Sequence, residues 1–136
     1  VVIGEDGLGQ TVLFEQETGT DQINPDGTTT ALTSFVQSFN FSLQKDQSEV
    51  FLAMRRFLPN FKVLTGSNQV TIGVSNWPTE AASQSTYSPF TILPDTQYKS
   101  TRARGRYANI KIENINVGEN WRFGTFQVDI QPDGRR

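Results

Sequence analysis

The sequence contains no histidine and no cysteine among its 136 residues. Without them the chain cannot build a Ser-His or Cys-His nucleophilic pair, the common zinc sites or a disulfide. It also lacks an apolar run of 18 residues and the apolar core of a signal peptide, so it predicts no membrane-spanning helix. The formal net charge is −2, which provides no overall field that would draw the chain to nucleic acid or to an anionic membrane.

The amino-acid composition is typical of a protein built from strands and turns. Hydrophobic residues are 35% of the chain, and there are 10 phenylalanines but only one methionine. A high content of Thr, Gln and Phe with little Ala, Leu and Lys favours strands over helices. The length is sufficient for one domain with its own core. We therefore expect residues 1–136 to form a single β domain, in which residues 1–29 are a lead-in strand and loop.

Alternation of apolar and polar residues with period two predicts most of the strands. The cleanest case runs from Phe35 to Leu43, where odd-numbered side chains would face a core and even-numbered ones would face solvent. Two later segments alternate in the same way. The side chains expected to line the core are Phe35, Phe39, Phe41, Val70, Ile72, Val74, Val128 and Ile130.

Prolines and turn residues divide the rest of the chain into short elements. Residues 49–58 are predicted as a strand that Pro59 ends, although a helical stripe also fits them. The segments 61–64 and 69–75 are typical of a hairpin. A strand within 89–94 has prolines at both ends and fits only at a sheet edge. Seven or eight short strands predict an all-β fold, an antiparallel β-sandwich, with a closed β-barrel as the structural alternative.

The last third of the chain carries most of its positive charge. Eight of the 12 basic residues lie from Lys99 onward. Arg102, Arg104 and Arg106 recur with period two, so an unbroken strand would place three guanidinium groups on one face. Gly105 is the natural position for a bulge that exchanges the faces. A polar turn and a second strand follow, which predicts a hairpin at the C-terminal end.

Three interpretations of the arginines are open. They can form ion pairs with the carboxylates between residues 113 and 133 in the same hairpin. They can pair with an acidic surface on a neighbouring subunit, because the planar fork of arginine suits carboxylates. They can bind phosphates of DNA, which the net charge of the chain weighs against. The candidates for a subunit contact are Arg102, Arg104, Arg106, Arg122, Arg135 and Arg136.

Carboxylates are the remaining candidates for catalysis. Glu15 with Glu17 could form the pair that a glycosidase needs, but the solvated face of a strand explains them more simply. Asp129 and Asp133 offer a second pair, of which Asp133 lies in a Pro-Asp-Gly turn signature. Residues 22–27 match part of a calcium loop but lack its first and last acidic ligands. We expect no enzymatic activity, no metal site and no cofactor.

The order of several short motifs resembles that of a known class of proteins. The motifs of the last third are Arg104-Gly-Arg106, Ile110-Lys-Ile112, Trp121-Arg-Phe-Gly124 and Asp129–Arg136. Weaker matches upstream lie at Val50–Phe61 and Val70–Pro78, so the resemblance extends over residues 30–136. Together these motifs resemble the C-terminal end of large structural proteins in the virions of short-tailed bacteriophages.

This resemblance implies a non-enzymatic structural component of a phage virion, which mediates subunit contacts in the tail or the head–tail connection. Its partners would be other copies of itself and neighbouring virion proteins, and neither a membrane nor nucleic acid. It would be made in the cytoplasm of the bacterial host and would act in the virion. The family proteins are much longer, so the chain is either a fragment or an unusually short member. Because it does not begin with methionine, we expect a C-terminal fragment of a longer virion protein.

Exposed aromatic side chains suggest an alternative function, because aromatic rings stack on sugar rings. The candidate stacking residues are Trp77, Tyr87 and Tyr98. Packing in the core is the default for a tryptophan. The long polar loop expected within residues 77–88 is where a binding site could form most readily. The alternative is therefore a module that binds carbohydrate on the host surface.

Overall fold

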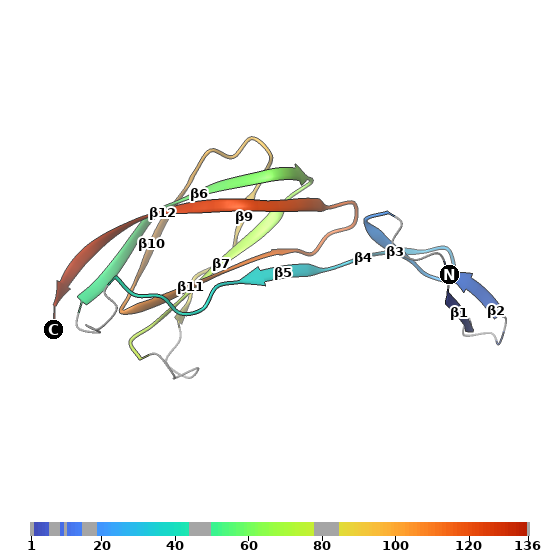
Figure 1. Cartoon of the computed structure of the whole chain (residues 1–136), viewed down its shortest axis with the longest axis horizontal. Helices are drawn as coiled ribbons and strands as arrows, with labels where there is room; N and C mark the ends of the chain where they lie inside the picture. Colours follow the sequence, from blue (N-terminus) through green and yellow to red (C-terminus); the bar gives the residue numbers. More distant parts are fainter. Residues whose placement is uncertain are drawn as a thin grey trace.

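A computed structural model describes residues 2–5, 9, 11–14, 19–43, 50–77 and 85–135. These described residues form strands, turns and loops and contain no helix. Two antiparallel sheets pack face to face, and a smaller group of strands extends from one end of them (Figure 1). The predicted antiparallel β-sandwich is confirmed. None of the sheets in the described part of the chain closes on itself, so the barrel alternative is not adopted.

The first sheet has three strands in the order β10–β6–β12. Its central strand β6 (Val50–Thr65) pairs antiparallel with β10 (Lys99–Gly105) and with β12 (Asn120–Arg135). The strand predicted over 49–58 is therefore present, but Pro59 does not end it. β10 pairs with β6 only as far as Phe57, so one side of β6 is an open edge at Pro59, where a missing N–H is tolerated.

The second sheet packs across the core from the first. From edge to edge it consists of β5 (Ser34–Gln37), β11 (Tyr107–Asn114), β7 (Asn68–Ser75) and β8 (Ser85–Thr86), with β9 (Phe90–Ile92) also beside β7. The proline-flanked edge strand predicted within 89–94 is confirmed as β9, which pairs with the outer side of β7. Residues 78–84 of the predicted loop lie outside the described residues.

Both predicted hairpins of the sandwich are wrong. β6 and β7 follow one another in the chain but belong to different sheets, and the same is true of β11 and β12. The chain crosses between the sheets at residues 66–67 and again at 115–119. Turn residues in the sequence predict where a strand ends. They do not distinguish a strand that turns back within its sheet from one that crosses the sandwich.

The arginine-rich segment is likewise two strands and not one. β10 ends at Gly105 in the first sheet, and β11 begins at Tyr107 in the second. A Cβ atom at Gly105 would lie 2.9 Å from the Cβ of Val74 and 3.1 Å from the carbonyl oxygen of Tyr107. Glycine is therefore required because β10 approaches β7 closely here. The irregularity in the ladder of β10 lies between Ser100 and Ala103.

The core lies between the two sheets. Val70, Ile72 and Val74 are buried as predicted, with at most 5% of each side chain exposed. Val128 and Ile130 are only partly buried and pack against the core from β12. The remaining buried apolar side chains that touch them are Leu52, Met54, Phe57, Ile92, Ala103, Ala108, Ile110 and Ile112.

The predicted wall of phenylalanines is largely wrong. Phe35 is 65% exposed and Phe39 is 96% exposed. β5 is the edge strand of its sheet and ends at Gln37, so Phe39 lies beyond it. Only Phe41 packs against the core, where it forms an isolated bridge with Ala108. The alternation correctly indicated a strand but carried no information on whether another sheet covers it.

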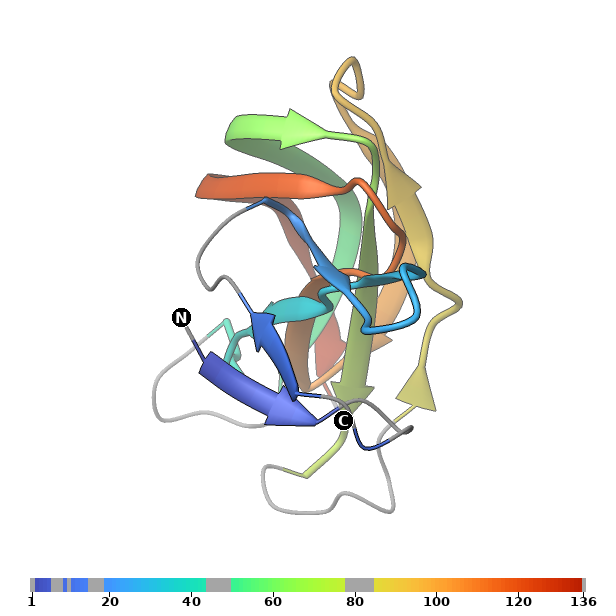
Figure 2. The ribbon, with the colours of Figure 1, turned by 90° about the vertical axis from the view of Figure 1, so that its right-hand side faces the viewer.

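The strands that precede β5 form an N-terminal arm, a name used here for the described residues from Val2 to Ala31. β1 (Val2–Glu5) pairs with β2 (Thr11–Phe14), and β3 (Asp21–Ile23) pairs with β4 (Thr29–Ala31). The region predicted as a lead-in strand and loop thus contains two short hairpins. The arm extends from the end of the sandwich, as Figure 2 shows with the blue strands in front.

Candidate subunit-contact site

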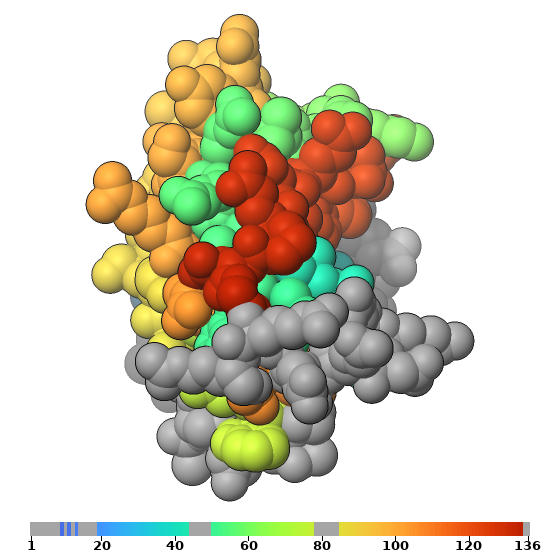
Figure 3. Space-filling view, turned by 90° about the vertical axis from the view of Figure 1, so that its left-hand side faces the viewer, coloured from blue at the N-terminus to red at the C-terminus, as the bar shows by residue number. Residues whose placement is uncertain are grey.

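Three arginines gather at the end of the sandwich that is opposite to the arm. Arg102 and Arg104 come from β10 and Arg55 comes from β6, and together with Asp133 they line a surface pocket of about 180 Å³. We call these three residues the arginine patch. Figure 3 faces this end of the molecule, where β6 (green), β10 (orange) and β12 (red) meet at the surface.

Irregular pairing on both sides of β6 aims these side chains outward. The β6–β12 register shifts immediately after Asp129, so Arg55 has no partner on β12. The β10–β6 register shifts at the same level, just before Ala103. Bulges of this kind redirect side chains, and here Arg55 and Arg56 are both exposed although they are consecutive. Arg55 is not predicted from the sequence, because nothing in the order of its neighbours indicates a bulge.

Carboxylates neutralise only part of this charge. Arg104 forms an ion pair with Asp133 through Nε, and its Nη2 also donates to the Asp133 carbonyl oxygen at 3.2 Å. Arg56 pairs with Asp129 at 3.3 Å. Arg55 and Arg102 form no ion pair with any described residue. Among the described residues, two guanidinium groups without a carboxylate partner therefore share one pocket, where like charges repel and an external carboxylate would offset them.

Arg106 is not part of the arginine patch. It lies beyond Gly105 at the corner between the sheets, and its guanidinium carbon is 5.4 Å from the ring centre of Phe51 and 5.7 Å from that of Trp77. Its Nε is buried without a hydrogen-bond partner among the described residues. These cation–π contacts hold the Arg106 side chain against aromatic rings of its own chain.

The other predicted arginines of β12 lie near its opposite ends. Arg122 pairs with Val63 on β6, whereas Arg104 pairs with Ala53 on the same strand. Ten residues of strand correspond to about 33 Å, so Arg122 is far from the arginine patch. Arg135 pairs with Val50 at the patch end, but its side chain and Arg136 lie outside the described residues.

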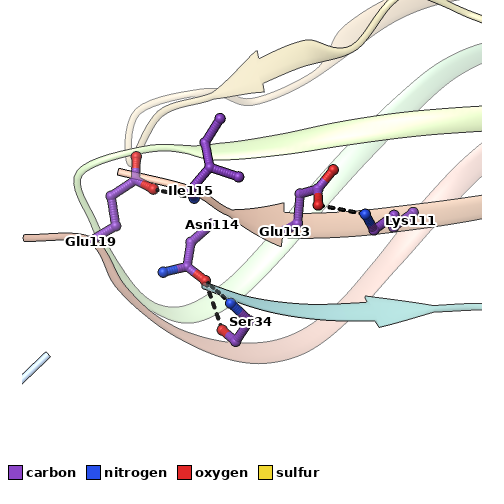
Figure 4. Close-up of polar contacts among 6 residues, drawn as sticks. All are labelled: Ser34, Lys111, Glu113, Asn114, Ile115 and Glu119. Atoms are coloured by element: carbon purple, nitrogen blue, oxygen red, sulfur yellow. Dashed lines mark hydrogen bonds and ion pairs between the residues drawn. The ribbon is translucent and has the colours of Figure 1, made fainter. Parts of the chain in front are cut away.

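Glu119 was expected among the possible partners of arginine and has a different role. Its carboxylate is 5% exposed and accepts hydrogen bonds of 2.6–3.3 Å from Ser67, Ile115 and Asn116. Burial raises the pKa of this carboxyl, but the hydrogen bonds outweigh burial and lower the pKa from 4.5 to about 2. Glu119 thereby joins the crossing at 66–67 to the turn at 115–119; Figure 4 shows its bond to Ile115.

Polar contacts fix the root of the arm, where it joins β5, to the end of the sandwich that contains the turn at 115–119. The buried Asn114 accepts hydrogen bonds from the backbone N–H and hydroxyl of Ser34, both at 2.7 Å (Figure 4). Its amide nitrogen donates to the carbonyl oxygen of Leu32 at 3.1 Å. The Asp21 carboxylate accepts the N–H of Gly118 at 2.8 and 2.9 Å. Nearby, the Glu113 carboxylate, which the sequence offered as a partner of arginine, pairs with Lys111 instead.

Apolar side chains lie exposed along the arm and β5. We call five of them the apolar edge. They lie in the stretch of chain from β3 to the residues just after β5. Their exposed fractions range from 40% for Val36 to 96% for Phe39, and the five are Ile23, Leu32, Phe35, Val36 and Phe39. The ring of Phe35 also has the Lys111 ammonium 5.0 Å from its centre.

The three residues proposed for glycan stacking have different surroundings. Tyr87 packs partly buried against the core, and its hydroxyl accepts the backbone N–H of Arg104 at 3.3 Å. Trp77 is 55% exposed, with Arg106 over its ring, and Tyr98 is 54% exposed. Carbohydrate binding stays a prediction.

Comparison with known proteins adds no identification. No family model matches the chain, and no curated protein sequence matches it. Within the described residues, no helix is long and apolar enough to span a membrane. In the same part of the chain, no three residues of the types His, Cys, Asp and Glu gather closely enough to hold a metal ion.

Proposed function

We propose that this chain is a non-enzymatic structural component of a phage virion and mediates subunit contacts in its tail or head–tail connection. The motifs of residues 30–136 that resemble phage structural proteins support the virion assignment. The apolar edge carries the assignment to subunit contacts, above all Phe39, which is 96% exposed.

Exposed apolar side chains of this number are unfavourable in water. Removing apolar surface from water contributes roughly 25 cal/mol per Å², and a run of exposed large apolar residues is typical of an interaction surface. β5 and β12 are also open edge strands, whose unpaired backbone groups can pair with another chain. Contact with another subunit would cover both the apolar edge and these open edges.

The test is the sedimentation of the full chain across a concentration series. We expect reversible self-association that the double substitution Phe35→Ser/Phe39→Ser weakens at least tenfold. The matched control is Leu93→Ser/Tyr98→Ser, which removes a leucine and a tyrosine of 48% and 54% exposure outside the arm and β5. The control should associate like the unchanged chain. Equal loss in both variants, or a chain that is monomeric throughout, would contradict a contact through the apolar edge.

The virion assignment has a separate test. Antibodies raised against this chain should label purified particles of the phage that encodes it, at the tail or at its junction with the head. Labelling can be scored by electron microscopy against particles treated with pre-immune serum. Particles that contain none of this protein would contradict the virion assignment, whatever the outcome of sedimentation.

A further inference from the structure

Charge is strongly segregated along this chain. Residues 1–31 contain six acidic residues and no Lys or Arg, so this segment has a net charge of −6. Residues 99–136 contain eight basic and four acidic residues, which gives a net charge of +4. The overall value of −2 hides this separation.

The fold places the N-terminal arm and the arginine patch at opposite ends of the molecule. The arm extends from the end where β12 begins, and the arginine patch lies where β12 finishes (Figure 1). A strand of 16 residues such as β12 spans about 50 Å. The contact between Asp21 and Gly118 further holds the root of the arm at its own end. In this fold, the arm of a molecule does not reach the arginine patch of the same molecule.

We infer that the acidic arm of one copy docks on the arginine patch of the next copy, in a head-to-tail contact. This inference rests on the proposed function and names the partner of the site. The contact joins two different surfaces of the same chain, so it is heterologous. Repetition of such a contact gives a closed ring if the rotation closes and an open filament if it does not.

The arginine patch is suited to carboxylates in particular. Arg55 and Arg102 are both exposed, share the pocket and have no ion pair within the described residues, while Asp133 already engages Arg104. Arginine presents a planar pair of donors that bind both oxygens of a carboxylate. The pocket between the guanidinium groups of Arg55 and Arg102 would receive acidic side chains of the arm. The apolar edge, which continues from the arm into β5, would be covered in the same contact.

Reciprocal charge reversal in the full chain tests this contact. The patch variant carries Arg55→Glu and Arg102→Glu, and the arm variant carries Glu5→Lys and Asp26→Lys. Each alone places like charges on both surfaces, so we expect the association constant to fall at least tenfold in sedimentation. Mixing the two variants restores opposite charges at every contact and should restore association. Raising the salt from about 50 to 500 mM should weaken association of the unchanged chain.

The matched control reverses two basic residues elsewhere. Lys62→Glu/Arg122→Glu makes the same change in net charge on exposed positions at the arm end of the first sheet. It should associate like the unchanged chain, and circular dichroism should show that all variants keep the fold. Equal weakening by the control and the patch variant, or a mixture of reciprocal variants that does not associate, would overturn the inference.

The outcomes also separate this inference from the proposed function. Association that is insensitive to both charge reversals, but lost with Phe35→Ser/Phe39→Ser, would overturn the docking of the arm on the arginine patch and leave the apolar edge as the contact. A chain that stays monomeric at every concentration would contradict both the docking of the arm and the contact through the apolar edge.

Discussion

The N-terminal arm and the sandwich both consist of antiparallel strands, yet their apolar side chains lie in opposite environments. Ile23 in the arm is 67% exposed, whereas Ile72 in the sandwich is 1% exposed. Each hairpin of the arm has only two strands, and such a unit is marginally stable by itself in water. β7, by contrast, has strands on both sides and a second sheet across the core. Burial therefore depends on what surrounds a strand and not on its pattern.

The largest expected effect comes from comparing two phenylalanines. Phe57 is fully buried, and its ring centre lies 5.5 Å from that of Phe126 and 5.9 Å from that of Phe90. Phe57→Ala should lower the free energy of unfolding by about 3–5 kcal/mol. Phe39→Ala should lower it by less than about 0.5 kcal/mol, because the side chain is exposed. Urea denaturation of dilute protein measures both. If Phe39→Ala lowered the free energy of unfolding by more than about 1 kcal/mol, Phe39 would be a buried residue and the comparison would fail.

The second comparison sets the Glu119 carboxylate against that of Asp26. Hydrogen bonds lower the pKa of Glu119 from 4.5 to about 2, which corresponds to about 3 kcal/mol of stability at neutral pH. Because the pKa is lower in the folded state, this contribution is complete above about pH 4.5 and is lost as the pH falls toward 2. Glu119→Gln should therefore be less stable at pH 7 and differ little from the unchanged chain near pH 2.

Asp26 provides the matched control in the arm. Hydrogen bonds from the side chain and backbone N–H of Thr28 lower its pKa, but this carboxylate is exposed. Asp26→Asn should leave the unfolding of the sandwich unchanged between pH 2 and pH 7. Urea denaturation at both pH values gives the difference between each variant and the unchanged chain. A pH-independent difference for Glu119→Gln would contradict the role of its charge.

Two glycines with positive φ make the third comparison. Gly66 has φ of 79°, and a Cβ there would lie 2.9 Å from Cγ of Glu119. Gly66→Ala should destabilise the sandwich by about 1–3 kcal/mol, from backbone strain and displacement of Glu119. Gly27 in the arm has φ of 81° with open space around it, so Gly27→Ala should not change unfolding of the sandwich. Thermal denaturation distinguishes them, and equal shifts in Tm would contradict the prediction.

The smallest expected effect is a gain in stability. Asn68 at the start of β7 is fully buried, and in the described part of the chain neither polar atom of its side chain has a hydrogen-bond partner. Asn68→Leu replaces the amide with an apolar group of similar volume and should raise the free energy of unfolding by about 1–2 kcal/mol. Asn24 in the arm is hydrogen-bonded to Thr28 and offers no such gain. A loss of stability in Asn68→Leu would show that the amide is satisfied in solution.

The sequence predicted the class of fold and the central strand of the second sheet because both depend on local pattern. Val70 and Ile72 alternate in a strand with neighbours on both sides, so the pattern and the burial agree. Phe39 follows the same pattern beyond the end of an edge strand, and there the two disagree. Pairing across the sandwich is a long-range property, so the crossings at 66–67 and 115–119 looked like hairpins in the sequence.

The candidate site was predictable only in part, for similar reasons. Arg102 and Arg104 were found because they recur with period two on one strand. Arg55 was missed because bulges on both sides of β6 turn it outward, and Arg122 was included although strand length carries it far away. Glu119 lies three residues after Asn116 and accepts its backbone N–H. This spacing is that of a capping box, but a capping box marks the start of a helix and a strand follows here, so nothing in the sequence signals this role.

The way in which the arm joins the sandwich also determines how the molecule responds to mechanical tension. The arm continues directly into β5, which is held antiparallel to β11 from Ser34 to Gln37 (Figure 1). Hydrogen bonds between antiparallel strands lie perpendicular to the strands. A pull along the arm therefore loads the bonds of β5 together, in shear, and does not open them one after another. Subunits linked from arm to arginine patch would pass tension from the second sheet, which contains β5, to the first sheet, which carries the arginine patch.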